Sequence, residues 1–155
     1  MLTAARDTYL ETQVHTATPQ RLRLMLLDGA LRFARQTHAL WQRNESDAAY
    51  DSLVRCRDIV AELIAGIQAD ASPLAKTVLK LHLYLFSALT EAQLKQDQQQ
   101  LAAIISVLEE ERETWQRLCE QFPDRPPAAA AATITSREEL APAFIAAAEQ
   151  FSLDA

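Results

Sequence analysis

The chain has 155 residues, of which 49% are hydrophobic and 23% are charged, and its formal net charge is −6. This length fits one domain with a hydrophobic core. The negative charge argues against broad binding of nucleic acid or anionic membranes, since phosphate contacts need clustered Lys and Arg. The chain has only two glycines, it is dominated by good helix formers, and it lacks alternating strand patterns. These features predict an all-α protein.

Residues 1–17 are predicted to form an N-terminal segment ahead of the first long helix. The segment begins MLTAARDTYLETQ and lacks the cationic start and apolar stretch of a signal peptide. The longest apolar runs of the chain are too short to span a bilayer. We therefore expect a cytoplasmic protein with no membrane insertion.

The first long helix is predicted to begin at Thr18 and Pro19, an N-cap followed by proline at the first helical position. The pattern fades at Arg43. An apolar stripe with alternating spacings of three and four follows the cap: Leu22, Leu26, Gly29, Phe33, Thr37 and Leu40. Glycine inside a helix costs about 1 kcal/mol relative to alanine. Close approach of two helices is the favoured explanation for Gly29. The alternative is that the missing side chain gives the backbone of a partner access to the helix.

Three further helices are predicted from their caps. Ser46 is expected to cap the second, Ser72 followed by Pro73 the third, and Asp97 with Gln100 forms a capping box for the fourth. The expected core stripe of the second helix is Ala49, Leu53, Cys56, Val60, Leu63 and Ile67. That of the fourth is Leu101, Ile104, Leu108, Trp115, Leu118 and Phe122.

The predicted fold is an antiparallel up-down four-helix bundle over residues 18–122. Helices of twenty-odd residues would each be about 30–35 Å long. Their short connections make sequential helices antiparallel neighbours. A Pro/Ala linker is expected over residues 123–135 and an extra amphipathic helix over 136–155. This last helix is predicted from a capping box at Ser136 and Glu139 and from the apolar residues Leu140, Phe144, Ala147, Ala148 and Phe151.

The third helix is apolar on two sides. Its expected core stripe is Leu74, Val78, Leu81, Leu85, Ala88 and Ala92, and a second stripe lies roughly opposite: Leu79, Leu83, Phe86 and Leu94. Either the N-terminal segment or the C-terminal helix covers this second face, or it forms a groove for an amphipathic helix of a partner. Both hold if a segment of the chain covers the groove until the partner displaces it.

No constellation for catalysis, metal or cofactor binding stands out. His15, His38 and His82 are scattered, and no E-x-x-H, H-E-x-x-H, P-loop or G-x-G-x-x-G motif is present. Cys56 and Cys119 are expected to be buried free thiols of a reducing cytosol, with a disulfide or metal pair as the alternative. The carboxylates of the fourth helix are expected to form a solvated face balanced by Arg112: Glu109, Glu110, Glu111 and Glu113.

One enzymatic interpretation stays open. Arg32 and His38 have the R-x5-H spacing used by some helical ribonucleases. Such spacing also arises by chance in a helix rich in arginine.

The segment from Tyr9 to Phe33 closely resembles the start of the flagellar secretion chaperone family FliS. The residues that fall on the family's pattern are Tyr9, Val14, Thr16, Ala17, Pro19, Leu22, Met25, Leu26, Asp28 and Gly29. Leu27 stands where the family usually has tyrosine. CRDIVAEL (56–63), EAQLKQD (91–97) and RETW (112–115) resemble later family motifs in the same order. The resemblance covers about residues 9–122, and the tail from Pro123 has no recognised counterpart.

The resemblance implies a chaperone, not an enzyme, that captures the disordered C-terminal region of flagellin in the cytoplasm. It would prevent premature polymerisation and aid delivery to components of the flagellar export apparatus. In the family, flagellin occupies apolar grooves and displaces the chaperone's own N-terminal segment. The residues expected to bind the partner are Tyr9, Val14, Thr16, Pro19, Leu22, Met25, Leu26 and Gly29 of the N-terminal motif, together with Leu79, Leu83, Phe86 and Leu94 of the second stripe.

Two further expectations concern partners. An adaptor for another secreted protein is an alternative to flagellin binding. Residues 136–155 would fit a groove of their own molecule or of a neighbouring one, so self-association is also among the expected interactions.

Overall fold

A computed structural model describes residues 3–9 and 18–121 of the chain. Residues 3–9 form a short helix, and the chain continues through α2 (Pro19–Gln42), α3 (Ser46–Ala65), the 3-10 turn η1 (Ala69–Ala71), α4 (Pro73–Lys95) and α5 (Gln98–Gln121). All regular structure in these two ranges is helical, which confirms the all-α class there. No helix among them is long and apolar enough to cross a membrane. The predicted linker 123–135 and helix 136–155 lie outside the described residues.

Three of the four caps predicted for the long helices are present. Thr18 Oγ1 accepts from the Arg21 N–H at 3.3 Å, Ser72 Oγ from the Ala75 N–H at 3.0 Å, and Asp97 Oδ1 from the Gln100 N–H at 3.0 Å. The prediction for Ser46 is wrong, because the N-cap is Glu45, which makes no side-chain capping bond, and Ser46 is already helical.

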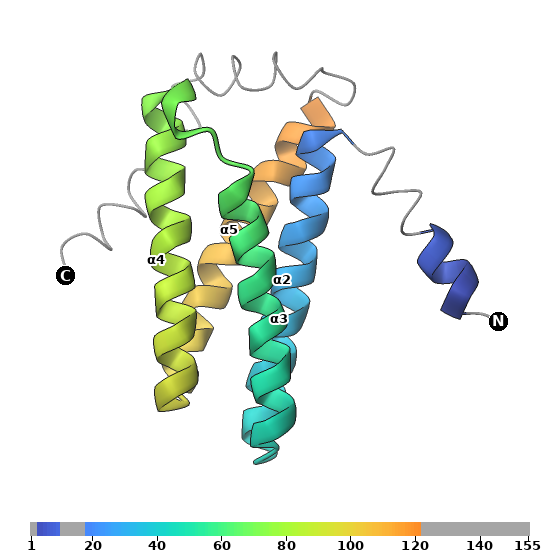
Figure 1. Cartoon of the computed structure of the whole chain (residues 1–155), viewed down its shortest axis with the longest axis vertical. Coiled ribbons are helices and arrows are strands. Elements are labelled where there is room, and N and C mark those ends of the chain that lie inside the picture. Colours follow the sequence, from blue (N-terminus) through green and yellow to red (C-terminus); the bar gives the residue numbers. More distant parts are fainter. Residues whose placement is uncertain (1–2, 10–17, 122–155) are drawn as a thin grey trace.

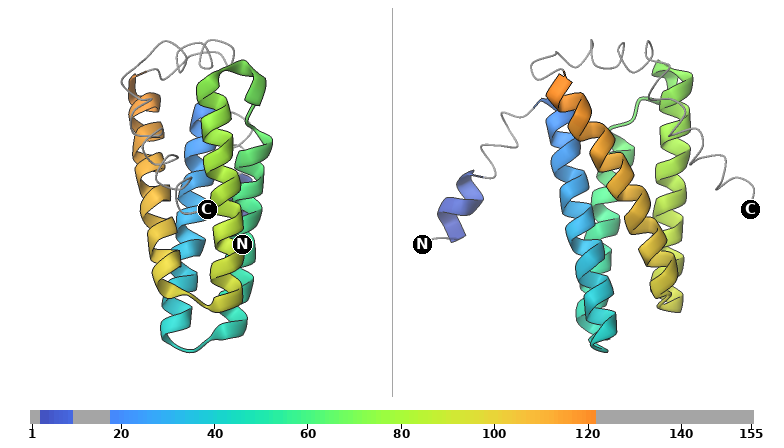
Figure 2. Two further views of the ribbon diagram at one scale, coloured as in Figure 1. Left: turned by 90° about the vertical axis from the view of Figure 1, so that its left-hand side faces the viewer. Right: turned by 180° about the vertical axis from the view of Figure 1, so that it is seen from behind.

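The long helices alternate in direction along the chain, as the colours of Figure 1 show. α2 packs against α3 and α5, and α4 packs against the same two helices. α5 is tilted. It lies beside α4 where it begins and beside α2 where it ends, as seen from behind in Figure 2. α4 and α5 therefore diverge towards the end of the bundle where α2 begins.

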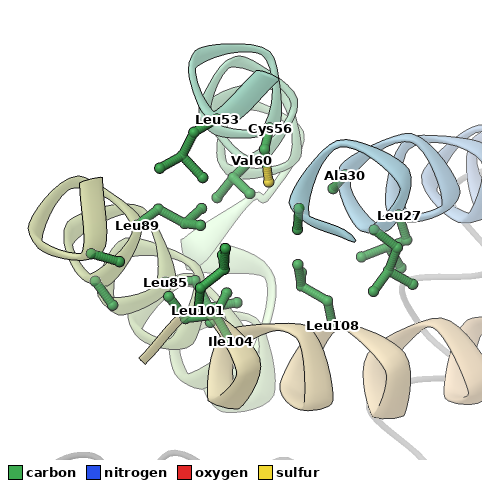
Figure 3. Packing of buried hydrophobic residues seen from close by; sticks show 14 of the residues in the cluster. Leu27, Ala30, Leu53, Cys56, Val60, Leu85, Leu89, Leu101, Ile104 and Leu108 are labelled. Carbon is green, nitrogen blue, oxygen red and sulfur yellow. The ribbon is translucent and has the colours of Figure 1, made fainter. Parts of the chain in front are cut away.

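The core fills the space between the four helices (Figure 3). The expected stripe of α3 is buried from Ala49 to Leu63, whereas Ile67 lies beyond the helix and is only half-buried. Leu101, Ile104 and Leu108 of α5 are buried as predicted. The residues of the core cluster that are at most 1% exposed are Leu27, Ala30, Leu31, Ala34, Ala49, Leu53, Cys56, Val60, Leu63, Leu85, Leu89, Ala92, Leu101 and Leu108.

The predicted core stripe of α2 is correct for Thr37 and Leu40, which are buried, but wrong for the first part of the helix. Leu22, Leu26 and Phe33 are only half-buried, whereas Leu27 and Leu31 are at most 1% exposed. The buried face is centred about one residue step, roughly 100°, from the predicted stripe. The reason is that α2 packs between α3 and α5, and only contacts with both helices decide which part of its broad apolar surface becomes central.

Gly29 lies where α2 and α3 approach closely. A Cβ atom added there would come within 3.2 Å of Ile59 Cδ1 on α3. This contact supports close helix packing as the reason for glycine in the middle of the helix.

Candidate functional site

An apolar cleft of about 640 Å³ lies at the end of the bundle where α2 and α4 begin and α3 and α5 end. Pro19, Leu22 and Leu26, three of the residues predicted to bind a partner, line it. Its lining residues come from the end of the bundle at which α4 and α5 diverge (Figure 2). A concave and mostly apolar surface of this size is typical of a binding site.

The walls of the cleft include residues that were predicted to lie in the core. Leu74 and Val78 of α4 line it and are half-buried. Their burial was wrongly predicted because the helical pattern continues to the start of α4, while the tilted α5 no longer covers it there. Trp115 and Leu118 of α5 contribute to the same lining.

Arg23 links α2 to the three other helices beside the cleft, which it lines. Its Nη1 donates to the Leu63 carbonyl oxygen of α3 at 3.5 Å, and its guanidinium carbon lies 5.1 Å from the centre of the Trp115 ring. Its Nη2 lies 3.8 Å from Glu111 Oε1 and 3.4 Å from His82 Nε2. Burial lowers the pKa of Arg23, and the charge of Glu111 acts against this shift.

His82 and Glu111 form a buried pair between α4 and α5. Nε2 of His82 lies 2.9 Å from Oε1 of Glu111, and Nδ1 lies 2.8 Å from the Val78 carbonyl oxygen. Because Nδ1 faces an acceptor, it carries a proton. A second proton is needed between Nε2 and the carboxylate oxygen, since two lone pairs at this distance would repel. One proton on either of these two atoms makes the contact a hydrogen bond.

The prediction that Glu111 lies on a solvated face is wrong, because its exposed fraction is 2%. Glu109, Glu110 and Glu113 are exposed, as predicted. A signal for Glu111 was present in the sequence, since it continues the apolar spacing from Leu108 towards Leu118. Its basic partners on α2 and α4 are distant in sequence and could not be identified from the spacing.

Unpaired donors add polar groups to this apolar cleft. The side-chain nitrogen of Gln20 and the indole nitrogen of Trp115 are buried without a hydrogen-bond partner, and so is Nε of Arg23. All three residues line the cleft. Buried donors normally have partners.

A second apolar surface follows the outer side of α4. Leu83 is 51% exposed and Leu94 82% exposed, and eleven residues, about three turns, place them on the same side of the helix. Leu79 and Phe86, also in the predicted stripe, are half-buried. Phe86 packs against the core cluster, and the guanidinium carbon of Arg57 lies 5.0 Å from its ring centre. The exposed part of the stripe is therefore narrower than predicted.

The remaining predicted residues do not form one site in the described structure. Tyr9, at the end of the short helix 3–9, is 63% exposed. Met25 and Gly29 are half-buried on α2 and are not among the residues that line the cleft. Val14 and Thr16 lie outside the described residues.

The residues considered for other chemistry are separated in space. Arg32 and His38 are six positions apart on α2, about 240° around the helix, so they point to different sides. Cys56 and Cys119 are both free and buried, as predicted. Burial raises the pKa of Cys56 to about 12. No group of three or more His, Cys, Asp or Glu that could hold a metal ion occurs in residues 3–9 and 18–121.

Comparison with known proteins gives one consistent result. Residues 1–122 match the model of the family described as "Flagellar protein FliS". A relative from Bacillus subtilis, named flagellar secretion chaperone FliS, is 26% identical over 109 residues, which cover 70% of this chain and 81% of the relative. A relative of the same name from Vibrio cholerae is 24% identical over 122 residues, which cover 78% of this chain and 90% of the relative.

Proposed function

This chain belongs to the flagellar protein FliS family, and we propose that it is an export chaperone that binds the disordered C-terminal region of flagellin. The observation that carries this proposal is the apolar cleft between the four helix ends, together with exposed leucines on α4. A disordered segment gains free energy by burying its amphipathic faces on a preformed surface. Binding would keep the segment from polymerising before it reaches the export apparatus.

The cleft is the proposed binding site for an apolar helical segment of flagellin, the client of the chaperone. Pro19, Leu22 and Leu26 approach it from α2, and Leu74 and Val78 from α4. Such side chains suit the apolar face of a partner helix.

The outer side of α4 is the proposed second contact. Leu83 and Leu94 lie about 16 Å apart along the helix axis at 1.5 Å per residue. This distance corresponds to about three turns of a partner helix laid alongside. The N-terminal segment with Tyr9, Val14 and Thr16 is proposed to move when the client binds, as the family resemblance implies.

Calorimetric titration with a synthetic flagellin C-terminal peptide tests the proposal. Leu22→Ser together with Leu74→Ser should weaken binding by roughly tenfold or more, which is 1.4 kcal/mol or more. Leu83→Ser together with Leu94→Ser should weaken it separately, because that pair lies on the other surface. Tyr50→Ser is the control, since Tyr50 is 58% exposed, belongs to α3 and does not line the cleft.

The outcomes separate the alternatives. Circular dichroism must show unchanged helix content in every variant. No binding of the peptide by the unaltered chain would overturn flagellin as the client and favour an adaptor for another secreted protein. If the cleft variant, the α4 variant and the Tyr50 control all bind the peptide with equal affinity, the assignment of both surfaces is overturned.

A further inference from the structure

The described chain ends beside the cleft. Thr114, Trp115 and Leu118 of α5 line the cleft, and α5 ends at Gln121. Gln121 is three residues beyond Leu118, about 5 Å along the helix axis. Whatever follows Gln121 therefore starts next to an open apolar surface.

The 34 residues that follow, 122–155, have the composition of a tethered ligand for such a surface. Residues 123–135 contain three prolines and five consecutive alanines, and residues 136–155 carry the apolar positions from Leu140 to Phe151. Pro142 interrupts a regular helix after Leu140. Beyond it, at about 100° per residue, Phe144, Ala147, Ala148 and Phe151 fall within an arc of about 100° on a helix. The family match ends at residue 122, so this segment is a feature of the chain beyond the matched region.

We propose that residues 136–155 are an intramolecular occupant of the cleft and lay the Phe144–Phe151 stripe against it. The docking of this segment stands independently of the client. A second part of the proposal rests on the proposed function. Residues 136–155 and the flagellin region compete for the cleft, so flagellin must displace the tail before it can bind there.

The tether makes this contact favourable without a large interface. Eighteen residues lie between Gln121 and Leu140. Fully extended, this stretch could span about 60 Å, so its length does not restrict docking. Linking a ligand to its site by a short chain gives an effective concentration in the millimolar range. Weak apolar contacts are then sufficient to keep the cleft occupied.

Trp115 supplies a direct measurement, because it lines the cleft, whereas Trp41 is buried near the far end of α2. In a Trp41→Phe background, fluorescence reports on Trp115 alone. With Phe144→Asp and Phe151→Asp in the full chain, acrylamide quenching of Trp115 should rise several-fold and its emission should shift to the red. Unchanged Trp115 quenching and emission would overturn the proposal.

Two neighbouring alanines give a matched pair. Ala147 lies in the stripe, and Ala146 lies about 100° further around the helix and outside it. Ala147→Asp should expose Trp115, whereas Ala146→Asp introduces the same charge and should not. An equal effect of both changes would overturn the helical docking face.

Other occupants are distinguished by the same signal. If Leu10→Asp and Val14→Asp expose Trp115 while the tail changes do not, the N-terminal segment occupies the cleft and the proposal fails. If Trp115 becomes exposed on dilution while sedimentation shows dimers dissociating, the tail of a second copy is the occupant. Protection that is equal at low and high protein concentration supports docking within one molecule.

Titration of the flagellin peptide then tests competition. The tail variant Phe144→Asp/Phe151→Asp should bind the peptide several-fold more tightly than the unaltered chain. If Trp115 responds to the tail changes but the peptide affinity does not, competition is overturned. If neither protein binds the peptide, the proposed client fails, and the Trp115 measurements still decide whether the tail docks.

Discussion

His82 Nε2 on α4 lies 2.9 Å from Glu111 Oε1 on α5, and both side chains are at most 1% exposed. Arg23 of α2 reaches the same carboxylate and also bonds to the end of α3 through the Leu63 carbonyl oxygen. These contacts join all four long helices of the described structure next to the cleft. These polar contacts hold the four helices together at the end of the bundle where apolar packing is reduced.

Loss of Glu111 should therefore destabilise the bundle strongly. Glu111→Ala leaves the buried Arg23 guanidinium without its counter-charge and His82 Nε2 without its partner, and removing one member of a buried ion pair costs about 3–5 kcal/mol. Urea unfolding at neutral pH would measure this. Glu110→Ala, a change at an exposed neighbouring carboxylate, should alter the free energy of unfolding by less than about 0.5 kcal/mol. Similar losses for the two variants would contradict the role given to Glu111.

Gly29 allows a prediction whose result depends on one methyl group. Alanine is favoured over glycine in a helix by about 1 kcal/mol, but its Cβ would lie 3.2 Å from Ile59 Cδ1. In a protein that already carries Ile59→Val, which removes the Cδ1 methyl group, Gly29→Ala should raise the free energy of unfolding by about 1 kcal/mol. In the unaltered background the gain should be smaller. A double-mutant cycle of unfolding free energies measures the difference, and equal gains would show that the helices are not in close contact there.

Cys56 should make the protein sensitive to alkaline conditions. Its pKa is raised from 9.0 to about 12 by burial, so the folded state holds the proton more strongly than the unfolded state. This stability is fully present below the unfolded pKa and is lost as the pH rises towards the folded pKa. Between about pH 9 and about pH 11 the loss should approach 1.4 kcal/mol per pH unit.

Cys56→Ala isolates this contribution from that of other groups that titrate at high pH. The alanine variant should be less stable at neutral pH, because it loses a buried sulfur, but its stability should fall less steeply above pH 9. Unfolding free energies at several pH values provide the comparison. Parallel curves for the two proteins would contradict the assignment to Cys56.

The outer stripe of α4 should divide into structural and exposed members. Phe86→Ala should destabilise the bundle by about 1–3 kcal/mol, because the ring packs on the core cluster and beneath Arg57. Leu94→Ala, at a side chain 82% exposed, should change stability by less than about 0.5 kcal/mol. Thermal or urea unfolding distinguishes them. Equal costs would mean that Leu94 also has a structural contact.

The sequence alone determined the helical class and most helix starts, because these depend on local chemistry. Thr18, Ser72 and Asp97 each bond to a backbone N–H three residues later, and such contacts need no other part of the chain. Ser46 failed as a cap because Glu45 occupies that position, a shift of one residue that composition does not reveal. The buried stripe of α3 from Ala49 to Leu63 was also predictable, because its apolar residues recur at helical spacing.

Tertiary structure decided which apolar and charged side chains became central. α2 has a broad apolar surface, so only its packing between α3 and α5 places Leu27 in the core and Leu22 in the cleft. Because α5 is tilted (Figure 2), it does not cover the start of α4. Leu74 and Val78, which were predicted to lie in the core, therefore line the cleft. Glu111 is buried because Arg23 and His82, far away in sequence, meet it there. A local pattern contains the period of a helix, but only the packed bundle determines which direction around that helix faces its neighbours.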